Sequence, residues 1–99
     1  MSPRVNIDQH ELAAFCIRHH IRKLSLFGSV LRDDFGPESD VDVLVEFEPD
    51  HIPGLAFLDM EAELGRMLGH KVDLNTPGFL SSYIRDRVLQ EAEVQYVAA

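Results

Sequence analysis

Two aspartates that alternate with valines are the residues of this sequence best suited to chemistry. Val41, Val43 and Val45 recur at every second position, which predicts a strand with one apolar face packed on a core. Asp40 and Asp42 then share the opposite face, with Cα atoms about 6 to 7 Å apart given the rise of a strand. Two such carboxylates repel each other, and a divalent metal ion between them would relieve the repulsion. An isolated Asp-x-Asp pair is otherwise typical of a solvated strand face.

A Gly-Ser turn upstream of the aspartates has the features of a phosphate site. Residues 24–27 predict a short strand that ends at Gly28 and Ser29, and residues 29–35 favour a helix. Such a junction offers unpaired backbone N–H groups, a hydroxyl and the positive end of a helix dipole, and glycine lets a ligand approach the backbone closely. Arg32 is either a further cation for the same phosphates or a solvated surface arginine.

The two features together resemble a known family. Gly28-Ser29, ten intervening residues and then Asp40-Val41-Asp42 are similar to the signature of the DNA polymerase beta-type nucleotidyltransferase superfamily. With four fixed positions, a chance match arises on the order of once per thousand sequences. The short chain resembles the minimal nucleotidyltransferase (MNT) branch, and the likeness includes residues 45–49 and 69–74.

The resemblance implies nucleotidyl transfer from ATP with two Mg²⁺ ions held by carboxylates. Asp40 and Asp42 would bridge both ions. The family also has a third carboxylate on the next strand, and Asp73 is the only acid in the strand predicted over residues 71–75. Asp73 would hold only the ion that lowers the pKa of the attacking hydroxyl.

Phosphate binding is the second role that the resemblance implies. Gly28, through its backbone, and Ser29, through its hydroxyl, would hold the β- and γ-phosphates, with Arg32 as an auxiliary cation. The chain departs from many family members just beyond this arginine, where Asp33 replaces a glycine. Asp33 and Asp34 are interpreted as solvated surface acids, with tuning of metal or partner binding as the alternative.

A protein acceptor is also implied by the resemblance. Minimal nucleotidyltransferases similar to this chain are commonly encoded beside a HEPN-domain ribonuclease toxin, and they act as its antitoxin by transferring AMP to a tyrosine of the toxin. A cognate HEPN toxin is therefore the expected partner. Two alternatives stay open, namely an antitoxin that acts by occlusion without transfer, and a small-molecule nucleotidyltransferase of the antibiotic-modifying kind.

Length and composition limit the remaining possibilities. The 99 residues predict a single minimal nucleotidyltransferase domain over residues 1–99. The net charge of −8 and the lack of a basic patch argue against direct nucleic-acid binding. No apolar run approaches the roughly 20 residues of a membrane span, and the N-terminus does not resemble a signal peptide. We therefore expect a cytoplasmic protein without membrane contact.

Periodicity and turn residues predict the order of elements. The predicted helices cover residues 8–21, 29–35, 54–68 and 79–92, the predicted strands cover 24–27, 41–47 and 71–75, and residues 94–97 form an edge strand or fray. This order favours an α/β (α+β) domain, with a small mixed or antiparallel sheet of three to four strands and helices mainly on one face. The resemblance adds the polymerase beta-like nucleotidyltransferase fold. His51 lies in the loop over 48–53, either near the nucleotide or on the surface without a role.

Overall fold

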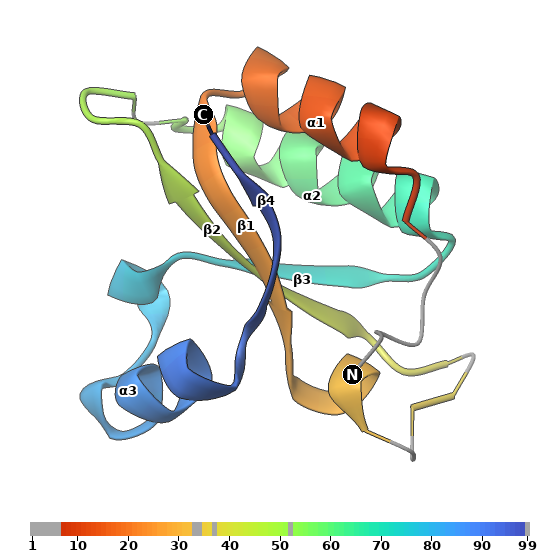
Figure 1. Ribbon diagram of the computed structural model, residues 1–99, viewed down its shortest axis with the longest axis vertical. Coiled ribbons are helices and arrows are strands. Elements are labelled where there is room, and N and C mark those ends of the chain that lie inside the picture. The colour runs from red at the N-terminus through yellow and green to blue at the C-terminus, as the bar shows by residue number, and fades with distance from the viewer. Residues whose placement is uncertain (1–6, 33–34, 37, 52, 99) are drawn as a thin grey trace.

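A four-stranded mixed sheet forms the centre of the molecule in the computed structural model, which describes residues 7–32, 35–36, 38–51 and 53–98. The strands are β1 (Ile21–Phe27), β2 (Val41–Phe47), β3 (Val72–Asn75) and β4 (Glu93–Val97), and their order across the sheet is β3-β2-β1-β4 (Figure 1). β1 is antiparallel to both β2 and β4, whereas β3 is parallel to β2. The predicted mixed sheet is confirmed, and residues 93–97 form the edge strand.

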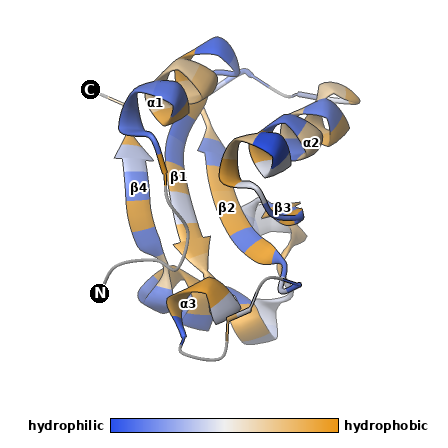
Figure 2. Ribbon diagram, turned by 90° about the vertical axis from the view of Figure 1, so that its right-hand side faces the viewer, coloured by the Kyte–Doolittle hydropathy of each residue, from blue (hydrophilic) through white to orange (hydrophobic). Residues whose placement is uncertain are grey.

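Two of the three α-helices in the described residues cover one face of this sheet. α1 (Gln9–Arg18) and α2 (Ala56–Leu68) lie side by side on that face, and α3 (Ser82–Glu91) lies apart from them near the opposite end of the strands (Figures 1 and 2). α3 packs on the other face, where its Val88 clusters with Leu44 of β2 and with Leu80. The expectation of helices mainly on one face is confirmed.

Successive side chains of β2 point alternately to the two faces of the sheet. Val41, Val43 and Val45 are fully buried in the main core, as their spacing predicts. The helices contribute to this core the large side chains of Leu12, Phe15, Met60 and Leu64. Because neighbouring strand residues point to opposite faces, Asp42 lies on the face away from α1 and α2.

The first helix starts as predicted but ends earlier. Asp8 is its N-cap, and the carboxylate accepts hydrogen bonds from the N–H groups of His10 (2.9 Å) and Glu11 (3.1 Å). The helix ends at Arg18, because His20 adopts a left-handed conformation (φ 58°) that turns the chain into β1. The prediction that the helix continues to residue 21 is wrong, since Ile21 is already a buried strand residue.

The predicted helix over residues 29–35 is also wrong. Only one 3₁₀ turn, η1 (Gly28–Leu31), forms, and Arg32 is extended, with φ −117° and ψ 162°. Val30 at the centre of this turn is fully buried in the main core. Burial of this side chain holds the turn against the core, and the chain then leaves in an extended conformation. Asp33 and Asp34 lie outside the described residues.

The last two predicted helices are each shorter than expected. α2 begins at Ala56 rather than at residue 54, because Gly54 has a positive φ of 58° that a right-handed helix does not allow. The segment before α3 contains the 3₁₀ turn η2 (Pro77–Phe79) and the extended, buried Leu80, so α3 covers residues 82–91 instead of 79–92. No helix in the described parts of the chain has the length and apolarity needed to cross a bilayer.

Candidate active site

Parallel pairing of β2 with β3 brings the predicted aspartates together. The register makes Asp42 and Asp73 direct partners, so their Cα atoms lie on neighbouring strands about 4.8 Å apart and their side chains share a face. Asp40 precedes β2 and shares that face by alternation. The N–H of Val41 donates to the carbonyl of Lys71 at 2.9 Å, which fixes the register beside Asp40. Three acids from two distant segments thus converge.

The electrostatic state of Asp42 reflects this convergence. Its pKa is raised above the ordinary value, first by burial and then by the negative charges of Asp73 and Asp40, while the positive charge of Arg32 acts in the opposite direction. A carboxyl group whose pKa is raised in this way is destabilised as an anion, and a bound cation would relieve that cost. The donor atoms are all carboxylate oxygens, the ligands that Mg²⁺ prefers.

Gly28 lies directly against Asp42. In the β1–β2 register Phe27 pairs with Asp42, so the residue after Phe27 meets the aspartate side chain. A Cβ atom built on Gly28 would overlap the Oδ2 of Asp42, and the backbone of Gly28 has a positive φ of 76°. Only glycine satisfies both conditions without strain, which explains the first residue of the Gly-Ser pair.

Ser29 connects the turn to the start of β2. Its hydroxyl donates to the backbone carbonyl of Asp40 at 3.4 Å, long for a hydrogen bond of this type. The bond is exposed, and a hydroxyl in so weak a bond can exchange it for a better acceptor such as a phosphate oxygen.

A cleft of about 540 Å³ adjoins Gly28, and one of its lining residues is an arginine that sequence reasoning missed. Its lining residues are Gly28, Leu31, Arg32, Arg87, Glu91 and Glu93. Arg87 belongs to α3 and forms an ion pair with Glu91 at 3.2 Å. No sequence signal identifies it, because an arginine four residues before a glutamate on a helix is an ordinary surface pair.

Glu61 is a second residue that sequence reasoning missed. β3 is an edge strand, and its Leu74 N–H, next to Asp73, donates to the Oε2 of Glu61 at 2.8 Å. The Glu61 carboxylate on α2 therefore accepts a hydrogen bond from a backbone N–H on the open edge of β3, next to Asp73. This contact holds the Asp73 segment against α2.

His51, for which the sequence left a place near the nucleotide or no role, lies away from the aspartates. It follows the C-terminal end of β2, whereas the aspartates lie around the start of that strand. Within the described part of the chain, only His20, Glu48 and His51 bring three potential metal-ligand atoms within 4.8 Å of one another. The aspartate oxygens are spaced more widely, as mutual repulsion favours.

Comparison with known proteins identifies the family of this chain. Residues 11–94 match the family model for a nucleotidyltransferase domain, a range that includes η1, β2 and β3. The chain belongs to this nucleotidyltransferase family, and its enzyme class is that of a nucleotidyltransferase.

Three similar proteins indicate which members of the family this chain resembles. Protein adenylyltransferase MntA of Thermococcus cleftensis is 41% identical over 75 residues, which cover 75% of this chain and 74% of the relative. A solved structure described as a candidate minimal nucleotidyltransferase is 32% identical, with a TM-score of 0.71 and 86% of each chain covered. A complex of a tri-AMPylated Shewanella oneidensis HEPN toxin with its MNT antitoxin has a TM-score of 0.65 at 18% identity, covering 91% of this chain and 70% of that one. At that identity the last match indicates the fold alone.

Proposed function

We propose that this chain is an antitoxin nucleotidyltransferase that transfers AMP from ATP, with two Mg²⁺ ions, to a tyrosine of a cognate HEPN ribonuclease toxin. The observation that carries the proposal is the pairing of Asp42 with Asp73, with Asp40 and the Gly28 turn beside them. Similarity to a protein adenylyltransferase supports the reaction, and the fold shared with an MNT antitoxin supports the partner.

The carboxylates fit the metal ions that this reaction requires. Asp40 and Asp42 would hold both ions, and Asp73 would hold the ion nearer the acceptor hydroxyl. Mg²⁺ in such a site lowers the pKa of the attacking hydroxyl and neutralises the charge of the triphosphate and of the departing pyrophosphate. The raised pKa of Asp42 is the feature of this chain that favours cation binding there.

The other residues act on the nucleotide. The backbone of Gly28 and the hydroxyl of Ser29 bind the β- and γ-phosphates, and Arg32 adds positive charge in the adjoining cleft. The acceptor oxygen forms a bond to the α-phosphorus while the bond from that phosphorus to the β-phosphate oxygen breaks. Pyrophosphate leaves, and the hydroxyl proton passes to water.

A protein acceptor is favoured by the similarity to a protein adenylyltransferase. The side chains of Leu55, Leu58, Phe79 and Tyr83 are 65 to 95% exposed and offer apolar contact area to such a partner. The net charge of −8 disfavours a nucleic-acid partner, and a cytoplasmic location is part of the same proposal.

The decisive experiment uses ATP labelled at the α-phosphate, Mg²⁺ and the protein encoded next to this chain. The wild type is compared with Asp40→Asn/Asp42→Asn and with Asp59→Asn, a control that removes an exposed acid from α2. We expect label on a partner tyrosine, with loss of its ribonuclease activity, for the wild type and the control only. Equal inhibition without label by all three proteins would replace the proposal with occlusion. Label on a small acceptor alone would favour an antibiotic-type activity.

A further inference from the structure

A second cluster of metal-ligating side chains lies at the other end of β1 and β2 from the aspartates. His20 precedes β1, and Glu48 and His51 follow β2, whereas η1 follows β1 and Asp40 precedes β2. One nitrogen or oxygen from each of these three side chains lies within 4.8 Å of the others. We propose that His20, Glu48 and His51 bind a divalent transition-metal ion of the Zn²⁺ type.

The backbone holds these three residues in place. The N–H of Glu48 donates to the carbonyl of His20 at 2.9 Å, and the N–H of His51 donates to the carbonyl of Glu48 at 3.1 Å. His20 has a φ of 58°, a left-handed conformation that histidine adopts more readily than most residues. This conformation turns the chain into β1 at the point where the His20 carbonyl accepts the hydrogen bond from Glu48.

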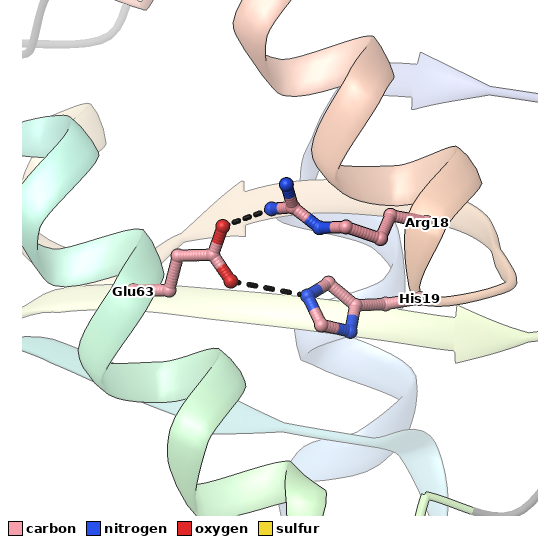
Figure 3. Close-up of polar contacts among 3 residues, drawn as sticks. All are labelled: Arg18, His19 and Glu63. Carbon is pink, nitrogen blue, oxygen red and sulfur yellow. Dashed lines mark hydrogen bonds and ion pairs between the residues drawn. The ribbon is translucent and has the colours of Figure 1, made fainter.

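A neighbouring ion-pair cluster fixes the turn from the other side. Both Arg18 and His19, at the end of α1, contact the carboxylate of Glu63 on α2, and the His19 Nε2 lies 3.1 Å from Oε1 (Figure 3). These contacts tie the α1–β1 turn to α2. They also engage His19 with Glu63, which leaves His20 as the histidine of this turn that faces Glu48 and His51.

The ligand set and its exposure match a transition metal better than Mg²⁺. Two imidazoles and one carboxylate are the protein ligands of an open zinc site, in which water takes the fourth position. The side chains of His20 and Glu48 are 51% and 44% exposed, so an ion and its water can reach them. The Nδ1 of His20 and the Oε2 of Glu48 are 3.7 Å apart, a separation that two ligands of one ion can have.

Binding requires a small rearrangement of exposed groups. The rings of His20 and His51 are stacked, with centroids 3.8 Å apart and an interplanar angle of 12°. Lone pairs of stacked rings lie in parallel planes, so one ring must rotate for both to bind one ion. Two ligands of a Zn²⁺ ion lie at most about 4.3 Å apart, since each bond is about 2.0 to 2.2 Å long. The exposed His51 side chain has room to rotate out of the stack and towards the other two ligands, and the bound ion would then link the α1–β1 turn to the loop after β2.

The test is calorimetric titration of the full chain with Zn²⁺ in excess Mg²⁺, which would compete with Zn²⁺ for the aspartates. His20→Asn keeps a residue that tolerates the positive φ while removing the imidazole, and His51→Gln and Glu48→Gln remove the other ligands. His10→Gln is the matched control, because His10 is an exposed histidine on α1. Circular dichroism verifies that each variant is folded.

We expect one Zn²⁺ per chain, with affinity at least about tenfold weaker in His20→Asn and His51→Gln and unchanged in His10→Gln. The Asp40→Asn/Asp42→Asn variant should bind Zn²⁺ as the wild type does, although it fails to transfer AMP, which separates this site from the proposed activity. No binding, binding unaffected by the two histidine substitutions, or binding lost only in the aspartate variant would each overturn the proposal.

Discussion

The backbone of Gly28 packs against the carboxylate of Asp42 so closely that even a methyl group at Gly28 would overlap it. The turn that follows β1 and the aspartate near the start of β2 are therefore in direct contact. Because Phe27 pairs with Asp42 in the sheet, a side chain added at Gly28 would displace this carboxylate. This relationship leads to the first prediction.

Gly28→Ala should lower the rate of AMP transfer by at least about tenfold and the free energy of unfolding by about 1 to 3 kcal/mol. Both the positive φ and the overlap with Asp42 contribute. Gly69→Ala is the matched control, because Gly69 has a similar φ of 70° but open space around it. It should lose only the backbone contribution, about 1 kcal/mol, and retain activity. Urea denaturation and the labelled-ATP assay measure both effects, and equal losses in the two variants would contradict the assigned overlap.

Asp40→Asn/Asp42→Asn should abolish transfer while leaving the free energy of unfolding unchanged or higher. The substitutions remove repulsion among carboxylates that the fold holds together. Asp59→Asn, which removes an exposed charge on α2, should retain activity. Chemical denaturation without Mg²⁺ provides the stability comparison, and a marked destabilisation of the double variant would argue that the acids have a structural role.

The pKa of Asp42 predicts a pH dependence of stability in the absence of metal. Its folded-state pKa lies above the ordinary value of 3.8, so the folded state binds the proton more tightly than the unfolded state does. The resulting stabilisation is present at low pH and is lost as the pH rises through the folded-state pKa. Compared with Asp42→Asn, the wild type should therefore become less stable as the pH rises from about 4 to 7. Parallel urea denaturation curves in EDTA measure the difference, and a constant difference would refute the raised pKa.

Mg²⁺ should reverse this loss. Ions bound only by the folded state stabilise it in proportion to the logarithm of their concentration. We expect Mg²⁺ to raise the Tm of the wild type and to leave the Tm of Asp40→Asn/Asp42→Asn nearly unchanged. Thermal denaturation with and without EDTA measures this. An equal rise in both proteins would mean that Mg²⁺ binds away from the aspartates.

Arg32→Gln should raise the KM for ATP by about tenfold or more, since a charged hydrogen bond to phosphate contributes about 1.5 to 3 kcal/mol. Arg87→Gln tests the second cation of the same cleft and should also raise the KM, by a smaller factor because Glu91 already pairs with Arg87. Arg66→Gln, an exposed arginine on α2, is the control. Steady-state kinetics with varied ATP concentration distinguish the three variants. An unchanged KM in both cleft variants would show that neither arginine binds the nucleotide.

Two segments show how much of the structure local sequence pattern predicts. The alternation of Val41, Val43 and Val45 predicted both β2 and the face that Asp40 and Asp42 share, because burial of every second side chain is a local property of a strand. Residues 29–35 show the limit of local pattern. Their composition favours a helix, yet burial of Val30 in the core left a single 3₁₀ turn, since tertiary packing outweighs propensity in so short a segment.

The sequence alone identified the candidate functional residues, whereas the tertiary structure determined which of them lie close together. The signature from Gly28 to Asp42 lies in one strand-turn-strand unit, so its resemblance to the family signature could be recognised in the sequence and indicated a nucleotidyltransferase. The contribution of Asp73 depends on β3 pairing in parallel with β2 in one register. Likewise, Arg87 joins the cleft only because α3 packs on the far face of the sheet, and His20 meets His51 only because β1 and β2 are antiparallel. Periodicity specifies which face of an element is buried, but which strands become neighbours depends on packing of the whole chain.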